Sequence, residues 1–140
     1  MAKNTSNQIK SMKPQEAILK LKSIYFKCSH LLEPKWRKMN EESGIESTGH
    51  CYVATEALFY LCGGIRSRLR PMYAKYFEGT HWWLVDEKGV IYDATDCQYG
   101  DEKPPYELGV RGGFLNGYKG PSKRAAAMIK LALSDTVFKH

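Results

Sequence analysis

One stretch decides the fold: residues 49–64, which read GHCYVATEALFYLCGG. Ser47 or Thr48 can cap a helix at its start, and Gly63-Gly64 is typical of a helix end. The residues between are almost all apolar. A helix with so few charges is usually buried in the middle of a fold. The sequence therefore predicts a central helix from about Gly49 to Cys62.

Upstream of this helix, we expect a polar, flexible arm over residues 1–12 and another helix from Pro14. Proline suits the first helical position because its missing N–H would be unpaired there anyway. Residues 30–48 are mixed, with a loop over 40–44. The apolar residues of the upstream helix recur at helical spacing: Ala17, Ile18, Leu21, Tyr25 and Cys28.

Downstream, the pattern is typical of strands. Residues 68–77 read as extended, with a proline that suits an edge strand. Residues 80–86 and 90–93 flank a short turn and predict a hairpin. Residues 96–120 read as a structured loop with one short strand, and a last helix begins at Ser122. The predicted fold class is α+β, a single domain over residues 13–140 with a central buried helix packed on an antiparallel sheet.

The chain has 140 residues, 43% of them apolar, which is ordinary for a folded globule. No apolar run reaches the roughly 18 residues that a membrane span needs. Residues 1–7 lack the apolar stretch of a signal peptide. We therefore expect a cytoplasmic protein without a membrane partner, whose four cysteines stay reduced.

The net charge of +6 is unevenly distributed. Residues 1–38 carry nine Lys or Arg and two Glu, a net charge of +7, whereas the remaining residues carry a net charge of −1. The excess therefore belongs to the arm and the first helix. A lysine-rich helix face is most often simply solvated, so nucleic acid is not an expected partner.

Three residues predict one site. Cys51 begins the central helix, where unpaired N–H groups favour a thiolate and can bind an oxyanion. His81 opens one hairpin strand and Asp93 ends the next, twelve residues later. Paired strands would bring these two together, so that Asp93 orients His81 toward Cys51. Trp82 or Trp83 could shield the pair from water.

This pattern resembles the core of the papain-like and transglutaminase-like cysteine superfamily, and most closely the small YunG-like proteins of bacteria and phages. The resemblance covers about residues 49–99. It is carried by Gly49-x-Cys51-Tyr52, Leu61-Cys62-Gly63-Gly64, His81-Trp82 and the run from Asp93 to Tyr99. It implies a papain-like fold and acyl-transfer chemistry. We expect Gly49, Tyr52, Trp82 and Gln98 to bind substrate.

Other interpretations of the same residues stay open. Cys51 and His81 could be core residues, and Asp93 could close the hairpin. His50 would form a wall beside the nucleophile. A zinc site from Cys51, His81 and Cys97 lacks the usual paired ligand spacing. An oxyanion donor from a side chain could come from Asn40, Trp36 or Gln98. Finally, Ser122, Lys123 and Arg124, joined by Arg111, could bind an anion at the start of the last helix.

The sequence thus predicts a cysteine hydrolase or acyltransferase that attacks an amide or ester of a protein or small molecule. No cofactor or metal is expected. The alternative is a non-catalytic protein on the same fold, such as a phage-type inhibitor of a host system, that binds a ligand or partner through its aromatic cleft.

Overall fold

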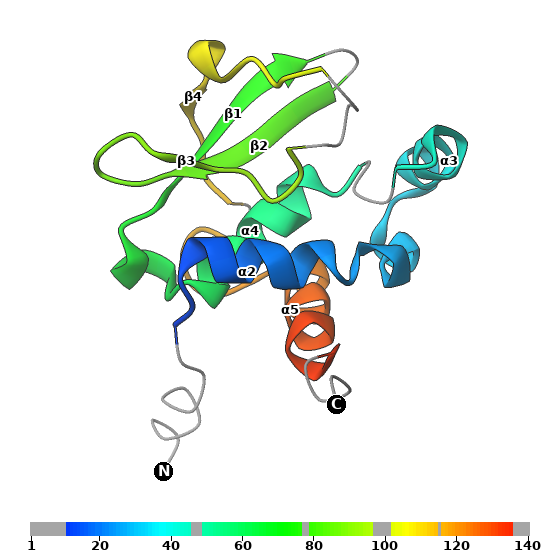
Figure 1. Cartoon of the computed structure of the whole chain (residues 1–140), viewed down its shortest axis with the longest axis horizontal. Coiled ribbons are helices and arrows are strands. Elements are labelled where there is room, and N and C mark those ends of the chain that lie inside the picture. Colours follow the sequence, from blue (N-terminus) through cyan, green and yellow to red (C-terminus); the bar gives the residue numbers. More distant parts are fainter. Residues whose placement is uncertain (1–10, 46–48, 77–78, 97–101, 115, 136–140) are drawn as a thin grey trace.

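The computed structural model describes residues 11–45, 49–76, 79–96, 102–114 and 116–135. Within them the chain is an α+β protein with four α-helices and a four-stranded antiparallel sheet of order β3-β2-β1-β4. Figure 1 shows helices α2, α4 and α5 gathered on one side of the sheet, with α3 standing away from them. The predicted α+β class with a central helix is confirmed.

Helix α4, Cys51–Leu61, is the centre of the packing. Nine of its eleven residues are buried, and it contacts α2, α5, β1 and β2. Its start comes two residues after the predicted Gly49, which instead adopts a left-handed φ of +86°. Gly63 and Gly64 also have positive φ and end the helix as predicted. The predicted cap residues Ser47 and Thr48 lie outside the described residues.

The helix upstream, α2, spans Pro14–Lys22 and has proline at its first position as predicted. The chain then continues through two short 3-10 turns, η1 (Tyr25–Lys27) and η2 (Ser29–Leu31), instead of extending the helix to Cys28. The end of the predicted flexible arm is held in place, because the N–H of Met12 donates to the carbonyl of Leu61 at 2.9 Å.

The expected loop over residues 40–44 was wrong. Residues Pro34–Ser43 form helix α3, whose start at proline and end at Gly44, with φ +71°, are ordinary helix signals. None of its residues is fully buried. Because the helix has no buried apolar face, its sequence lacks apolar residues at helical spacing. Periodicity alone could therefore not predict it.

The strands are β1 (Arg70–Tyr76), β2 (Gly79–Val85), β3 (Ile91–Tyr92) and β4 (Val110–Arg111). The predicted hairpin is present, because Asp86 accepts hydrogen bonds from the N–H groups of Lys88 and Val90 at its turn. The expectation that the proline marks an edge strand was wrong. Strand β1 lies between β2 and β4. Pro71 is tolerated in it because the pairing of β1 with β4 begins one residue later, at Met72.

A buried carboxyl group joins α4 to α5, Lys123–Asp135. Glu56 is fully buried on α4, and its two oxygens accept hydrogen bonds from the N–H and the hydroxyl of Ser122, each at 2.8 Å. The hydroxyl of Ser122 also accepts a bond from the N–H of Ala125, at 3.3 Å. The start of α5 is therefore held by a side chain from the middle of α4.

We expect Glu56→Ala to lower the free energy of unfolding by about 3 kcal/mol, because the buried carboxyl group would be lost and two half-buried donors of Ser122 would lose their acceptor. Glu41→Ala, which removes an exposed carboxyl from α3, is the matched control. Urea denaturation measures both. A loss for Glu56→Ala no larger than that for Glu41→Ala would show that this bond does not hold the helices together.

Candidate active site

His81 and Asp93 form a buried pair. The Nε2 atom of His81 lies 2.6 Å from Oδ2 of Asp93, and their side chains are 0% and 3% exposed. In the hairpin, Leu84 pairs with Tyr92 and Val85 with Ile91, so Asp93 would stand opposite Trp83. Asp93 therefore reaches His81 diagonally across the strands, on the same face. This is the neighbourhood that the spacing of twelve residues predicted.

The carboxyl group of Asp93 accepts three further hydrogen bonds. Its Oδ1 accepts a bond from the N–H of Thr95 at 2.9 Å and a longer one, 3.4 Å, from the Thr95 hydroxyl. The hydroxyl of Tyr106 donates to Oδ2 at 2.7 Å. A carboxyl group with this many donors is fixed in place beside the imidazole.

Cys51, the first residue of α4, lies against the edge of β2 that faces β3. The described pairing between these two strands begins at Leu84, so the earlier part of this edge is where the cysteine lies. Its Sγ donates to the carbonyl of Thr80 at 3.1 Å, and the N–H of Trp82 points at the same sulfur and lowers its pKa. The thiol is thus bound to the backbone on both sides of His81. The structure brings the three predicted residues together.

The pKa of the Cys51 thiol is raised from 9.0 to about 12. Burial is the main cause, and the charge of Asp93 adds to it, while the N–H groups of Trp82, Tyr52 and Cys51 itself lower the pKa. The expectation that the helix start makes Cys51 a thiolate was therefore wrong for the resting protein. The N–H groups act in the expected direction, but the loss of solvation outweighs them.

A pocket of about 230 Å³ opens onto the thiol. The predicted residues Gly49, Tyr52 and Trp82 line it, whereas the predicted Gln98, with Cys97 and Tyr99, lies outside the described residues. Tyr52 and Trp82 meet edge to face, with ring centroids 4.9 Å apart. The other lining residues are Trp36, Cys51, Gly79 and Thr80.

Trp36 forms the wall opposite the sheet, from helix α3. A Cβ at Gly49 would stand 3.1 Å from Cβ of Trp36, and a Cβ at Gly79 would stand 2.9 Å from its ring. Both glycines therefore let the tryptophan approach the backbone closely. Sequence reasoning named Trp36 as a possible polar donor but did not place it in the wall of this pocket, because helix α3 was not predicted.

A second hollow of about 480 Å³ adjoins this pocket and shares Trp36, Gly49 and Tyr52 with it. It reaches Lys123 and Arg124 at the start of α5. Ser122 does not contribute to the predicted anion site there, because Glu56 already occupies both of its donors, whereas Lys123 and Arg124 line the hollow. Arg124 lies 3.7 Å from Glu33. The predicted participation of Arg111 was also wrong, since Arg111 lines a different cavity.

The two tryptophans have separate positions. Trp83 is buried and stacks on His81, with ring centroids 5.9 Å apart, while Trp82 faces the pocket. Tyr106 meets Trp83 edge to face at 5.1 Å. Trp83 and Tyr106 therefore shield the His81–Asp93 pair from water. Tyr106 was missed because nothing in the sequence of residues 96–120 distinguishes it from the other tyrosines.

The remaining described cysteines, Cys28 and Cys62, are buried in the core. Burial raises the pKa of Cys28 to about 11 and that of Cys62 to about 12. In the described part of the chain, no three His, Cys, Asp or Glu side chains gather closely enough to hold a metal ion. None of the helices described is long and apolar enough to cross a membrane.

No protein-family model, curated protein or solved structure matches this chain.

His50, the residue before Cys51, does not line the thiol pocket as a wall. It is 1% exposed and stacks on Tyr25, with ring centroids 5.5 Å apart. Among the described residues, neither of its ring nitrogens has a hydrogen-bond partner. The pKa of His50 is lowered from 6.5 to about 4, mainly by burial and further by the charge of His30.

This buried imidazole should make stability depend on pH. As the pH falls from 6.5 to 4, the unfolded chain takes up a proton at His50 before the folded chain does, so stability present above pH 6.5 is lost. The pKa difference corresponds to about 3 kcal/mol. We expect His50→Phe, which keeps a stacking ring, to remove this part of the acid sensitivity in urea denaturation at pH 7 and pH 4.

His30→Gln is the control, because it removes an exposed histidine but leaves His50 buried. It should keep most of the acid-linked loss. Equal pH dependence in His50→Phe and the unmodified protein would show that His50 is not buried as described.

The raised pKa of Cys51 predicts its reaction with a simple alkylating agent. The rate of iodoacetamide labelling should rise about tenfold per pH unit between pH 7 and 9.5, since only the thiolate reacts. Peptide mass spectrometry measures the rate for each cysteine. The urea-unfolded chain, whose thiols have ordinary pKa values, is the control and should level off near pH 9. A plateau for folded Cys51 below pH 8.5 would contradict its burial.

Proposed function

We propose that the chain is a cysteine hydrolase or acyltransferase in which Cys51 attacks, His81 transfers the proton and Asp93 orients His81. The observation that carries the proposal is the buried 2.6 Å contact between Nε2 of His81 and Oδ2 of Asp93. Because this contact occupies Nε2, proton exchange with the thiol falls to Nδ1. A carboxylate so placed fixes the tautomer of the imidazole and stabilises the imidazolium that forms.

The resting thiol is protonated, so attack and proton transfer belong to one step. The S–H of Cys51 turns from the carbonyl of Thr80 toward Nδ1 of His81, which takes the proton as the sulfur attacks the carbonyl carbon. The imidazolium then gives that proton to the leaving amine or alcohol, and a thioester remains on Cys51. Water completes hydrolysis, whereas an amine completes acyl transfer.

The start of α4 offers donors for the oxyanion. The N–H groups of Cys51 and Tyr52 point at the sulfur and lower its pKa. They belong to the first turn of a helix, whose N–H groups have no partner within the helix. As the carbonyl carbon bonds to Sγ, the developing oxyanion comes within reach of these donors. They can supply the role for which the sequence offered Asn40, Trp36 and Gln98 as side-chain candidates.

The arrangement of elements supports the papain-like and transglutaminase-like resemblance. A buried helix begins with the cysteine and packs on an antiparallel sheet, one strand of which supplies the histidine. Asp93, the acidic residue of the predicted site, directly follows the next strand, β3. We therefore propose that the fold is a small papain-like or YunG-like core, with the aromatic pocket holding the acyl part of a protein or small amide or ester.

A second candidate function rests on the chemistry of the thiol. A cysteine with a pKa of about 12 that donates to a backbone carbonyl is also an inert residue at the floor of an aromatic pocket. On this view the chain is a non-catalytic protein that binds a ligand or partner through Trp36, Tyr52 and Trp82.

Acylation distinguishes the two functions. We expect p-nitrophenyl acetate to acetylate Cys51, seen by peptide mass spectrometry, and His81→Ala to slow this reaction by about 100-fold or more through loss of the base. Cys62→Ala removes another buried cysteine, at the far end of α4, and is the matched control. It should leave acylation unchanged.

Acetylation that is equally fast after His81→Ala would remove the histidine from its role as base. A chain in which Cys51 is never acetylated, even with excess ester, would favour the non-catalytic protein.

A further inference from the structure

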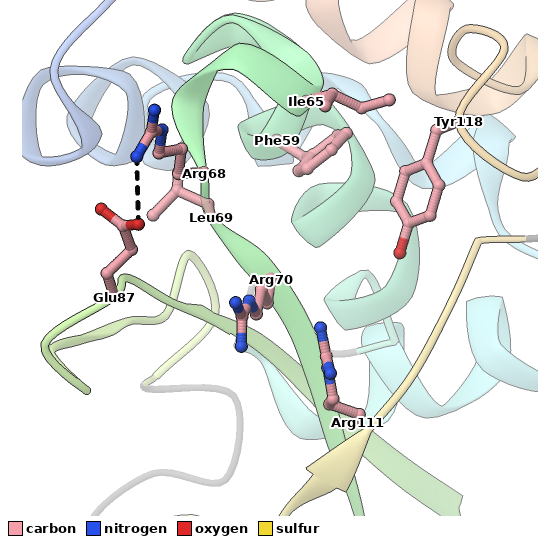
Figure 2. A pocket seen from close by; sticks show the side chains of 8 residues that line it. All are labelled: Phe59, Ile65, Arg68, Leu69, Arg70, Glu87, Arg111 and Tyr118. Atoms are coloured by element: carbon pink, nitrogen blue, oxygen red, sulfur yellow. Dashed lines mark hydrogen bonds and ion pairs between the residues drawn. The ribbon is translucent and has the colours of Figure 1, made fainter.

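A cavity of about 400 Å³ lies at the other end of α4 from Cys51 (Figure 2). It shares no lining residue with the thiol pocket. Its walls come from the end of α4, the turn η3 (Gly64–Ser67), the start of β1, the β2–β3 turn and strand β4. The residues that line it are Phe59, Ile65, Arg68, Leu69, Arg70, Glu87, Arg111 and Tyr118.

Three of these residues are arginines and one is acidic. Arg68 contacts Glu87 at 3.3 Å, so their charges offset each other. Within the described part of the chain, Arg70 and Arg111 have no acidic partner. Their strands pair with Met72 opposite Arg111, which makes Arg70 and Arg111 diagonal neighbours. The cavity therefore has two guanidinium groups in excess.

Figure 2 shows the guanidinium groups of Arg70 and Arg111 directed into the same space, with the hydroxyl of Tyr118 pointing toward them. The opposite wall is apolar. Ile65 is 65% exposed and Tyr118 44%, and the rings of Phe59 and Tyr118 lie 5.6 Å apart. An exposed apolar wall beside unpaired arginines suits a ligand that has one anionic end and one apolar end.

We propose that this cavity binds a small phosphate monoester with an apolar or aromatic substituent. Three arginines and Glu87 give the cavity a net charge of +2, which matches a phosphate monoester of charge about −1.5 to −2. Guanidinium groups bind such oxyanions through paired N–H donors. The substituent packs on Phe59, Ile65 and Tyr118, and the volume suits a ligand of this size.

The backbone conformation at Arg68 supports a role in ligand binding for the turn that joins η3 to β1. Its φ is +63°, and among the described non-glycine residues it alone is positive. This conformation costs an arginine more than a glycine. It turns the chain from η3 into β1, where Arg68 binds Glu87 and so leaves Arg70 free of that carboxyl group.

Calorimetric titration of the full chain with phenyl phosphate and with inorganic phosphate tests the proposal. We expect phenyl phosphate to bind more tightly than inorganic phosphate, because only phenyl phosphate reaches the apolar wall. Arg70→Gln and Arg111→Gln should each weaken binding of phenyl phosphate by about tenfold or more. Arg66→Gln removes an exposed arginine of η3 outside the cavity and should change the affinity less than twofold, as should Cys51→Ala.

Circular dichroism shows whether each variant is folded. If Arg66→Gln weakened binding of phenyl phosphate as much as the cavity variants do, binding would depend only on the overall charge of the protein. That result would overturn the proposal. So would the absence of phenyl phosphate binding at millimolar concentration. Benzoate binding as tightly as phenyl phosphate would overturn the assignment of a phosphate.

Discussion

Burial of helix α4 is the constraint on which the other features depend. The helix passes between α2, α5 and the sheet, so polar groups at its start and along its length must find partners inside the protein or remain neutral. Glu56 finds the donors of Ser122. Burial raises the pKa of Cys51 and lowers the pKa of His50. Cys51 therefore stays a thiol and His50 stays neutral. One packing arrangement thus accounts for three unusual groups.

The same burial defines how a reaction at Cys51 could proceed. Enzymes with a preformed thiolate separate charge before the substrate arrives, at a cost that rises as solvent is removed. Here the sulfur and the imidazole are both buried, and the carboxylate of Asp93 is held by Thr95 and Tyr106. In the reaction proposed above, charge separation is therefore delayed until attack, when the negative charge passes from the sulfur to the oxyanion of the substrate.

The sequence predicted the features that depend on local chemistry. The proline start of α2, the glycine end of α4 and the turn before β3 are each determined by residues close in the chain. The meeting of His81 with Asp93 followed from hairpin geometry. The carboxyl of Glu56 was not connected with Ser122, because the two are 66 residues apart and no periodic pattern relates them.

The thiol pKa was misjudged for a related reason. The N–H groups at the start of a helix can be recognised from sequence, whereas the burial that opposes them is a property of the assembled protein. Tyr106 was not predicted, and Trp36 was not predicted to line the pocket, because each reaches the site from an element whose packing only the fold determines.

The two cavities are separated by α4 but share its packing. Tyr52, which lines the thiol pocket, lies 6.0 Å from Phe114 between ring centroids, and Phe114 lies 5.3 Å from Phe59, which lines the arginine cavity. Tyr118 packs on both phenylalanines. The walls of the two cavities therefore belong to one continuous aromatic cluster. Closely packed side chains do not move independently, so a ligand that displaces Phe59 or Tyr118 must also disturb Phe114 and, through it, the wall beside Cys51.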